Sequence, residues 1–169
     1  MPEAPPSPST SPQTLLAELL ARKQAQTSLV DYVGYLDLGF APAAHHRLLI
    51  AALEEVERGE CSKLAVFMPP GSGKSVYTSQ IFPAWYLGRN PDHSVIAASH
   101  TQDLAERFGR KCRNLVASEE HRNVFGFGVA ADRQSASQWE TERAASTSRL
   151  GSAVRWQAGA VRWESSTIP

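Results

Sequence analysis

Apolar residues recur at the three- and four-residue spacing of a helix in several parts of the chain. The first such stretch follows Ser11, which we predict to be an N-cap with Pro12 at the first helical position. Its leucines share one face of the helix, and we expect this stripe to pack against the rest of the domain. The stripe consists of Leu15, Leu16, Leu19 and Leu20.

A second helix is predicted from about Ala43 to Arg58, with Gly59 as its stop signal. His45 and His46 lie near its start. Adjacent helix positions point in different directions and no third ligand is nearby in the sequence, so a metal site is disfavoured here. The residues expected on the apolar face are Leu48, Leu49, Ala52, Leu53 and Val56.

The middle of the chain alternates strand and helix patterns. The nearly continuous apolar run 63–68 is typical of a buried parallel strand. The segment Ser75–Leu87 is compatible with a helix that Pro83 should kink or divide, and residues 88–91 (Gly-Arg-Asn-Pro) form the turn that ends it. A second short strand is expected at 94–98.

Thr101 is predicted to cap a helix of about sixteen residues, with Asp103 in the first turn, where it suits the helix dipole. The segment 118–136 is less regular, and Trp139–Thr141 starts another predicted strand. The stripe expected to be buried on the Thr101 helix consists of Leu104, Ala105, Phe108, Cys112, Leu115 and Val116.

Basic side chains crowd the remaining surface of this helix. They are Arg107, Arg110, Lys111 and Arg113. Such a face is compatible with contacts to nucleic-acid phosphates, with a solvated surface and with a subunit contact. The net charge of the whole chain neither favours nor disfavours nucleic-acid binding, because its 17 basic and 17 acidic residues cancel.

The length of 169 residues leaves room for one domain with a real core. Residues 1–13 are expected to be a disordered arm rich in Pro and Ser, and residues 14–142 the domain itself. No apolar run approaches the length of a membrane span, so no membrane partner is expected. The alternation of strands and helices predicts an α/β fold with a parallel sheet flanked by helices.

The segment Pro69–Ser75 carries the most specific chemistry of the chain. A strand, a glycine-rich turn, Lys-Ser and a helix are the context of a phosphate-binding loop (P-loop). Gly71 and Gly73 let backbone N–H groups approach an anion, Lys74 would reach the outer phosphates, and Ser75 would take a Mg²⁺ ligand position. Met68 stands where the pattern G-x-x-x-x-G-K-[ST] expects glycine, so the loop is a variant. The predicted nucleotide-binding residues are Pro70, Gly71, Ser72, Gly73, Lys74, Ser75 and Val76.

The run from Phe40 to Thr141 resembles the ATPase domain of phage terminase large subunits. The most specific matching piece is Phe-Pro-Ala-Trp-Tyr-Leu-Gly-Arg-Asn-Pro at 82–91. Many relatives carry a basic residue inside the loop, where this chain has Gly71 or Ser72, so that catalytic role is not carried over. The other matching pieces are 43–48, 67–75, 98–100, 103–105 and 139–141.

This resemblance implies an incomplete P-loop NTPase-type fold and a motor that couples ATP hydrolysis to packaging of viral DNA into procapsids. It implies ATP and Mg²⁺ as cofactors, with Lys74 as the catalytic residue and Ser75 as the Mg²⁺ ligand. The implied partners are double-stranded viral DNA, the portal, the small terminase subunit and further copies in a ring. The implied location is the cytoplasm of a bacterial host.

The composition changes after Arg143, and Val-Arg-Trp occurs twice, at 154–156 and 161–163. Interleaved Arg and Trp are compatible with nucleic-acid binding. In the frame that starts at each codon's third base, however, this stretch can encode a glycine-rich segment followed by Asp-Asp, as the family has there. We therefore interpret residues 143–169 as an out-of-frame tail. Without an acidic strand in frame, we expect the chain to bind nucleotide but to hydrolyse it poorly.

Two other classes of function stay open on the sequence alone. One is a different P-loop NTPase, either helicase-like or a kinase, which would need an acidic strand and a substrate lid. The other is a non-catalytic nucleic-acid-binding protein that uses the Arg/Trp tail.

Overall fold

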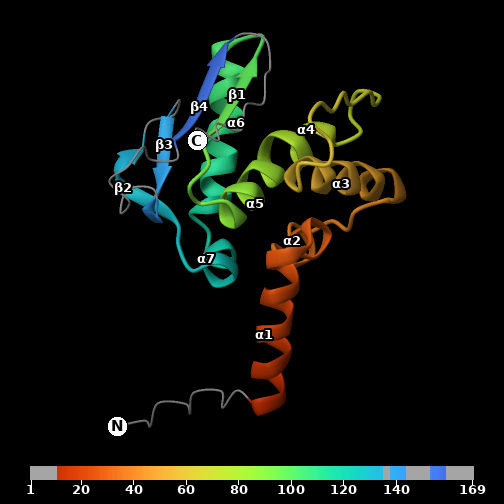
Figure 1. Cartoon of the computed structure of the whole chain (residues 1–169), viewed down its shortest axis with the longest axis vertical. Coiled ribbons are helices and arrows are strands. Elements are labelled where there is room, and N and C mark those ends of the chain that lie inside the picture. Colours follow the sequence, from red (N-terminus) through yellow and green to blue (C-terminus); the bar gives the residue numbers. More distant parts are fainter. Residues whose placement is uncertain (1–10, 135–137, 144–152, 159–169) are drawn as a thin grey trace, which may run out of the picture.

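The computed structural model describes residues 11–134, 138–143 and 153–158, and it mixes helices with a small sheet (Figure 1). The predicted α/β class is therefore confirmed in its coarse form. The helices are α1 (Pro12–Thr27), α2 (Leu29–Tyr35), α3 (Ala44–Glu57), α4 (Lys74–Val76), the π-helix η1 (Tyr77–Ile81), α5 (Phe82–Arg89), α6 (Gln102–Val116) and α7 (Glu119–Phe125). The strands are β1 (Val95–Ser99), β2 (Val129–Gln134), β3 (Gln138–Thr141) and β4 (Ala153–Ala158).

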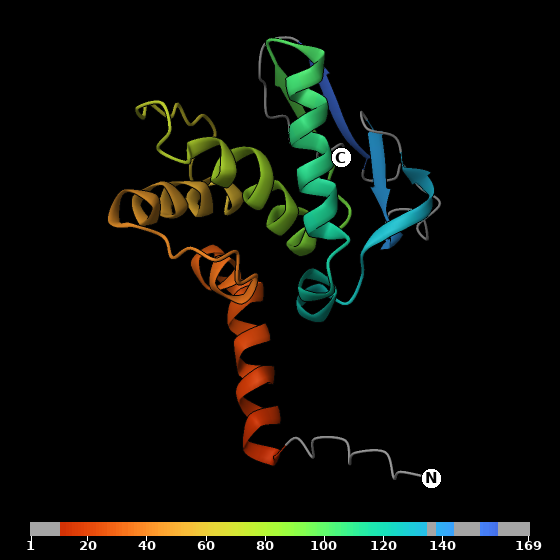
Figure 2. The ribbon, with the colours of Figure 1, turned by 180° about the vertical axis from the view of Figure 1, so that it is seen from behind.

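The four described strands form one sheet in the order β1-β4-β3-β2. β1 pairs in parallel with β4, with Val95 opposite Val154, whereas β4–β3 and β3–β2 are antiparallel. The sheet is thus mixed, and the expected all-parallel sheet is not what these strands form. Helix α6 lies along one side of the sheet (Figure 2).

The strand predicted at 63–68 is wrong, because this segment has no regular secondary structure. A strand needs neighbouring backbone to satisfy its N–H and C=O groups, and apolar side chains alone cannot supply it. Most of its side chains are exposed, and Phe67 is 92% accessible, whereas Val66 and Met68 are half-buried against the apolar core. By contrast, the strands expected at 94–98 and from Trp139 are confirmed as β1 and β3.

The start of α1 is as predicted, since Ser11 is its N-cap and Pro12 begins the helix. The Ser11 hydroxyl accepts a hydrogen bond from the Thr14 backbone N–H at 3.2 Å. The expectation that the leucine stripe packs against the domain is wrong. Leu15, Leu16, Leu19 and Leu20 are each more than half exposed, because the first half of α1 extends away from the other elements (Figures 1 and 2). Only its C-terminal end enters the core, at Ala25.

Helix α3 ends where the sequence predicted, with Gly59 in the left-handed conformation at φ 77°. Its buried face is rotated from the expected one. Leu49 and Leu53 are buried as predicted, but Leu48 is 76% exposed and Ile50 is 2% exposed. The apolar stripe is broad enough for two orientations, and contacts with distant elements decide between them.

The helical run from Lys74 to Arg89 contains a π-helix just before Pro83. The Phe82 N–H donates to the carbonyl of Tyr77, five residues earlier. Proline has no N–H and clashes with the preceding turn of an α-helix, so the widened turn accommodates Pro83 without breaking the run. The predicted kink or division at Pro83 thus takes the form of a π turn.

The buried apolar residues form two clusters that meet on this helical run. One cluster joins α1, α2, α3, η1, α5 and α7, with Trp85 and Tyr32 among its largest members. The other joins α5, β1, α6 and β3 around Trp139. The Trp85 indole N–H donates to the Ala25 carbonyl at 3.0 Å, which ties α5 to α1 inside the first cluster.

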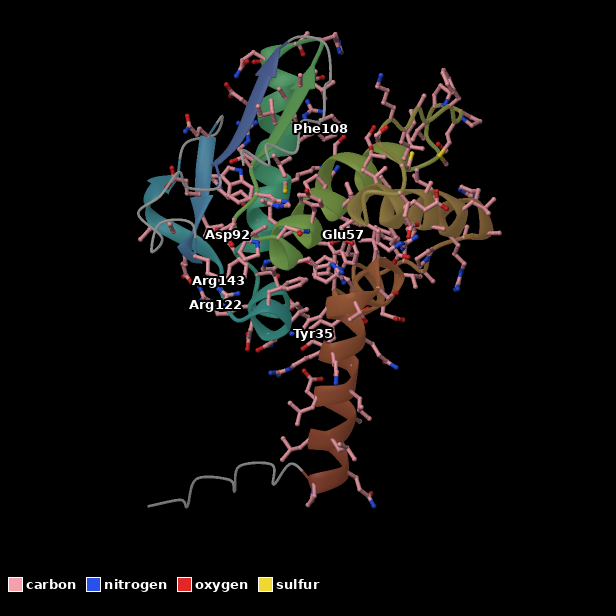
Figure 3. The ribbon with its side chains drawn as sticks, in the orientation of Figure 1. Tyr35, Glu57, Asp92, Phe108, Arg122 and Arg143 are labelled. Atoms are coloured by element: carbon pink, nitrogen blue, oxygen red, sulfur yellow. The ribbon has the colours of Figure 1, made fainter. Side chains whose placement is uncertain are left out.

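A partly buried ion pair closes the junction of α3 and α5, where Glu57 lies (Figure 3). Its carboxylate accepts hydrogen bonds from Arg89 at 2.8 Å and from Asn90 at 3.1 Å. Arg89 also donates to the Gln26 carbonyl at 3.0 Å. One carboxylate on α3 therefore holds the ends of α5 and α1 together.

Helix α6 follows its prediction closely. The Thr101 side chain caps it and Asp103 lies in the first turn. Of the expected stripe, Ala105, Cys112 and Val116 are buried, whereas Leu104, Phe108 and Leu115 are half-buried. Across the part of the chain that the structure describes, no helix has the length and apolarity needed to span a membrane. Most of the predicted tail 143–169 falls outside the described residues, so that hypothesis stays a prediction.

Gly88 of α5 allows a close approach of α7. A Cβ atom at this position would lie 2.5 Å from carbons of the Phe125 ring. We predict that Gly88→Ala destabilises the fold by about 1–3 kcal/mol, because either the ring or the helix must move. Urea unfolding checks this, with Gly34→Ala in α2 as the control, since nothing lies within 4 Å of a Cβ there. Equal stability of the two variants would contradict the prediction.

His121 of α7 is fully buried, and its Nδ1 lies 2.8 Å from the Tyr32 hydroxyl. Its Nε2 has no hydrogen-bond partner among the described residues. Burial, and secondarily the neighbouring Arg122, lowers the pKa of His121 from 6.5 to about 4. The unfolded chain therefore binds a proton across this pH range that the folded chain does not bind.

We predict that His121 contributes to stability in full above pH 6.5, and that this contribution is lost as the pH falls toward 4. The loss should reach about 3 kcal/mol. The free energy of unfolding, measured in urea from pH 7 to 4, should fall less steeply for His121→Gln than for the wild type. The same slope for both proteins would show that His121 is not the group responsible.

Candidate functional site

The glycine loop, defined as Pro69–Ser75, connects the irregular segment 61–68 to the start of α4. Its position is set from the C-terminal side, because the helical run that follows it is buried between the two apolar clusters. Residues of other elements that reach the loop include His46 of α3 and Tyr77 of η1. Thr78 of η1 also donates a hydrogen bond from its hydroxyl to the Lys74 carbonyl at 2.9 Å.

The backbone of the loop depends on its two glycines. Gly71 has φ 79° and Gly73 has φ 77°, values that residues with a side chain rarely adopt. Gly73 is the N-cap of α4, and its carbonyl accepts the Val76 N–H at 2.9 Å. The Ser72 N–H donates to the Pro69 carbonyl at 3.3 Å, which closes a tight turn.

The side chains of the loop include one cation and one unpaired hydroxyl. The Lys74 ammonium donates to the Met68 carbonyl at 3.3 Å, so this side chain folds back across the loop. Ser72 Oγ is buried and has no hydrogen-bond partner among the described residues. Ser75 and Val76 are half-buried, whereas Pro70 and Gly71 are exposed. The predicted nucleotide-binding residues are thus contiguous, with their most accessible part at Pro70 and Gly71.

The chemistry of this donor set suits an anion. The first N–H groups of a helical run have no intrahelical acceptor, and here they follow two glycines in the left-handed conformation and stand beside a lysine. The unpaired Ser72 hydroxyl is a further polar group in need of a partner. These residues therefore fit a phosphate group. No cluster of three or more His, Cys, Asp or Glu side chains suited to a metal ion occurs in the described ranges.

The sequence did not predict that His46 and Tyr77 contact the loop. His46 Nε2 lies 2.8 Å from the Ser72 carbonyl oxygen, and its ring packs on Tyr77 with centroids 4.6 Å apart. Sequence separation hides this contact, since His46 and Ser72 are 26 positions apart in the chain. The only signal was the position of His46 in a motif shared with the resembled family.

The basic side chains of α6 lie mostly on the surface. Arg107, Arg110 and Lys111 are exposed, and Arg113 is half-buried. Arg110 lies 3.7 Å from Glu106 one turn earlier, which neutralises part of this face.

A family model described as "Terminase large subunit, T4likevirus-type, N-terminal" matches residues 66–154, that is 89 of the 169 residues. The match contains the whole glycine loop and the elements α4 to β3. It does not include the piece 43–48, so the resemblance at His46 stays a prediction. Searches of curated proteins and of solved structures found no match.

Gly73 faces a second constraint beyond its positive φ, because a Cβ atom there would lie 3.2 Å from His46 Nε2. Gly59, with the same φ of 77°, has nothing within 4 Å of that position. We predict that Gly59→Ala costs about 1 kcal/mol of stability for its backbone conformation, and that Gly73→Ala costs more. Urea unfolding of the two variants measures the difference, and equal losses would argue against the contact with His46.

Proposed function

Because this chain belongs to the N-terminal family of T4-like terminase large subunits, we propose that it is the ATP-binding part of the motor that couples ATP hydrolysis to packaging of viral DNA into procapsids. The observation that carries the proposal is the glycine loop inside the matched region. It places two left-handed glycines, a lysine and a serine at the start of a buried helical run.

Four residues of the loop have distinct parts in this proposal. Backbone N–H groups at Gly71 and Gly73 bind phosphate oxygens, which the absence of side chains allows. Lys74 turns from the Met68 carbonyl to the outer phosphates and stabilises negative charge that develops on the transferred group. The Ser75 hydroxyl would hold the Mg²⁺ that accompanies ATP, whose charge would neutralise part of the phosphate charge.

The partners follow from the family and stay proposals. They are double-stranded viral DNA, the portal, the small subunit and further copies of the large subunit in a ring, in the cytoplasm of a bacterial host. The exposed side chains Arg107 and Lys111 on α6 offer a surface for DNA phosphates. Phosphate contacts of this kind give affinity without sequence specificity.

Hydrolysis is expected to be poor. Phosphoryl transfer needs groups that hold Mg²⁺ and orient the attacking water. We propose that the acidic strand which supplies them is encoded in the alternative frame that overlaps residues 143–169. Resequencing the gene through codons 142–145 tests this part separately, and an unchanged frame would contradict it.

We predict that isothermal titration with MgATP detects binding to the chain and that Lys74→Ala weakens it about 10- to 100-fold, because a hydrogen bond to a charged group is lost. Lys63→Ala is the matched control, since Lys63 is an exposed lysine outside the glycine loop, and it should bind within about twofold of the wild type. Equal binding by both variants, or no binding by the wild type, would contradict the proposed function.

A further inference from the structure

His46 lies in the first turn of α3 and makes two hydrogen bonds through its ring. Nδ1 accepts the Ala43 backbone N–H at 3.2 Å, as the third residue does in a capping box. A backbone N–H can only donate, so Nδ1 carries no proton and the ring proton is on Nε2. The Nε2–H group therefore donates to the Ser72 carbonyl, which lies 2.8 Å away.

The ring of His46 is also held by packing. Its centroid lies 4.6 Å from that of Tyr77, which is 1% exposed, with an angle of 35° between the planes. Gly73 leaves the space that the ring occupies, because a Cβ there would lie 3.2 Å from Nε2. The His45 ring also lies 4.0 Å from the His46 ring, centroid to centroid. Packing on Tyr77 and His45, in the space that Gly73 leaves, thus holds the donor in place.

Few other contacts hold this part of the loop. Within the described residues, the backbone of Pro69–Gly73 receives one hydrogen bond from a distant element, and His46 donates it. The preceding segment has no regular structure and Phe67 is 92% exposed, although Val66 and Met68 pack against the first apolar cluster. The Ser72 carbonyl therefore depends on His46 for its direction.

We propose that His46 is a positioning residue for nucleotide binding at the glycine loop, an inference that rests on the proposed function. The carbonyl of Ser72 and the N–H of Gly73 belong to one planar trans peptide, so they point to opposite sides of it. When His46 holds the carbonyl toward α3, the Gly73 N–H is directed away from α3. The hydrogen bond from His46 thus presets a phosphate-binding N–H without touching the nucleotide.

Three variants distinguish the effect of the Nε2–H donor from the effects of ring packing and of a substitution in the first turn of α3. His46→Phe keeps a ring on Tyr77 but removes the Nε2–H donor, together with the Nδ1 acceptor of the Ala43 N–H. It should weaken MgATP binding about fivefold in isothermal titration. His46→Gln places an amide N–H near the position of Nε2 and should bind within about twofold of the wild type. The control is His45→Phe. His45 is exposed, and among the described residues it makes no hydrogen bond to the loop. The affinity of this variant for MgATP should also stay within about twofold of the wild type.

Amide hydrogen exchange without nucleotide provides a second readout on the same chains. The peptide that covers 69–77 should exchange faster in His46→Phe than in the wild type, and His46→Gln should restore its protection. A general loss of folding would instead raise exchange across α3 and α5 as well.

The outcomes distinguish this inference from the proposed function. If the wild type binds MgATP in a Lys74-dependent way but His46→Phe binds equally well, the positioning role is wrong. It is equally wrong if His46→Gln is impaired as much as His46→Phe, because the donor then does not matter. If the wild type binds no MgATP, both the proposed function and the role of His46 in nucleotide binding are wrong. The exchange data then still show whether His46 holds the backbone of the loop.

Discussion

Burial of the helical run Lys74–Arg89 is the constraint on which the rest of the structure depends. Its residues contribute to both apolar clusters, through Tyr77, Ile81 and Trp85 on one side and through Ala84 and Leu87 on the other. A helix covered on so many sides cannot shift without disturbing both clusters. The glycine loop leads into the first turn of this helical run, so the position of the loop is fixed at its C-terminal end.

The other side of the loop is held much less firmly. Residues 61–68 approach it without regular structure, and Phe67 exposes an apolar ring to solvent. The hydrogen bond from His46 to Ser72 compensates in part, because it ties the loop to α3.

The sequence predicted well wherever local chemistry decides the structure. Side-chain caps marked the starts of α1 and α6 at Ser11 and Thr101, and Gly59 marked the end of α3 because only glycine adopts its φ readily. The glycine loop was found in the same way, from residue types at fixed spacing. Its contiguous residues needed no knowledge of distant contacts.

The sequence predicted poorly wherever distant residues decide. The apolar run 63–68 has the composition of a strand, but its pairing depends on backbone that the local pattern does not contain. The leucine stripe of α1 has helical spacing, but nothing in that spacing says whether another element covers it. The contact of His46 with the loop joins elements separated by an irregular segment, so no periodicity reports it. The pairing of β4 between β1 and β3 was missed for the same reason.

The most direct test of the account is amide hydrogen exchange of the wild-type chain with and without MgATP. Protection should rise in the peptide that covers Gly71–Ser75, because phosphate oxygens accept its N–H groups. Protection should change little in α7, on the far side of the first apolar cluster. Unchanged exchange at the glycine loop under saturating MgATP would contradict the claim that this loop binds nucleotide.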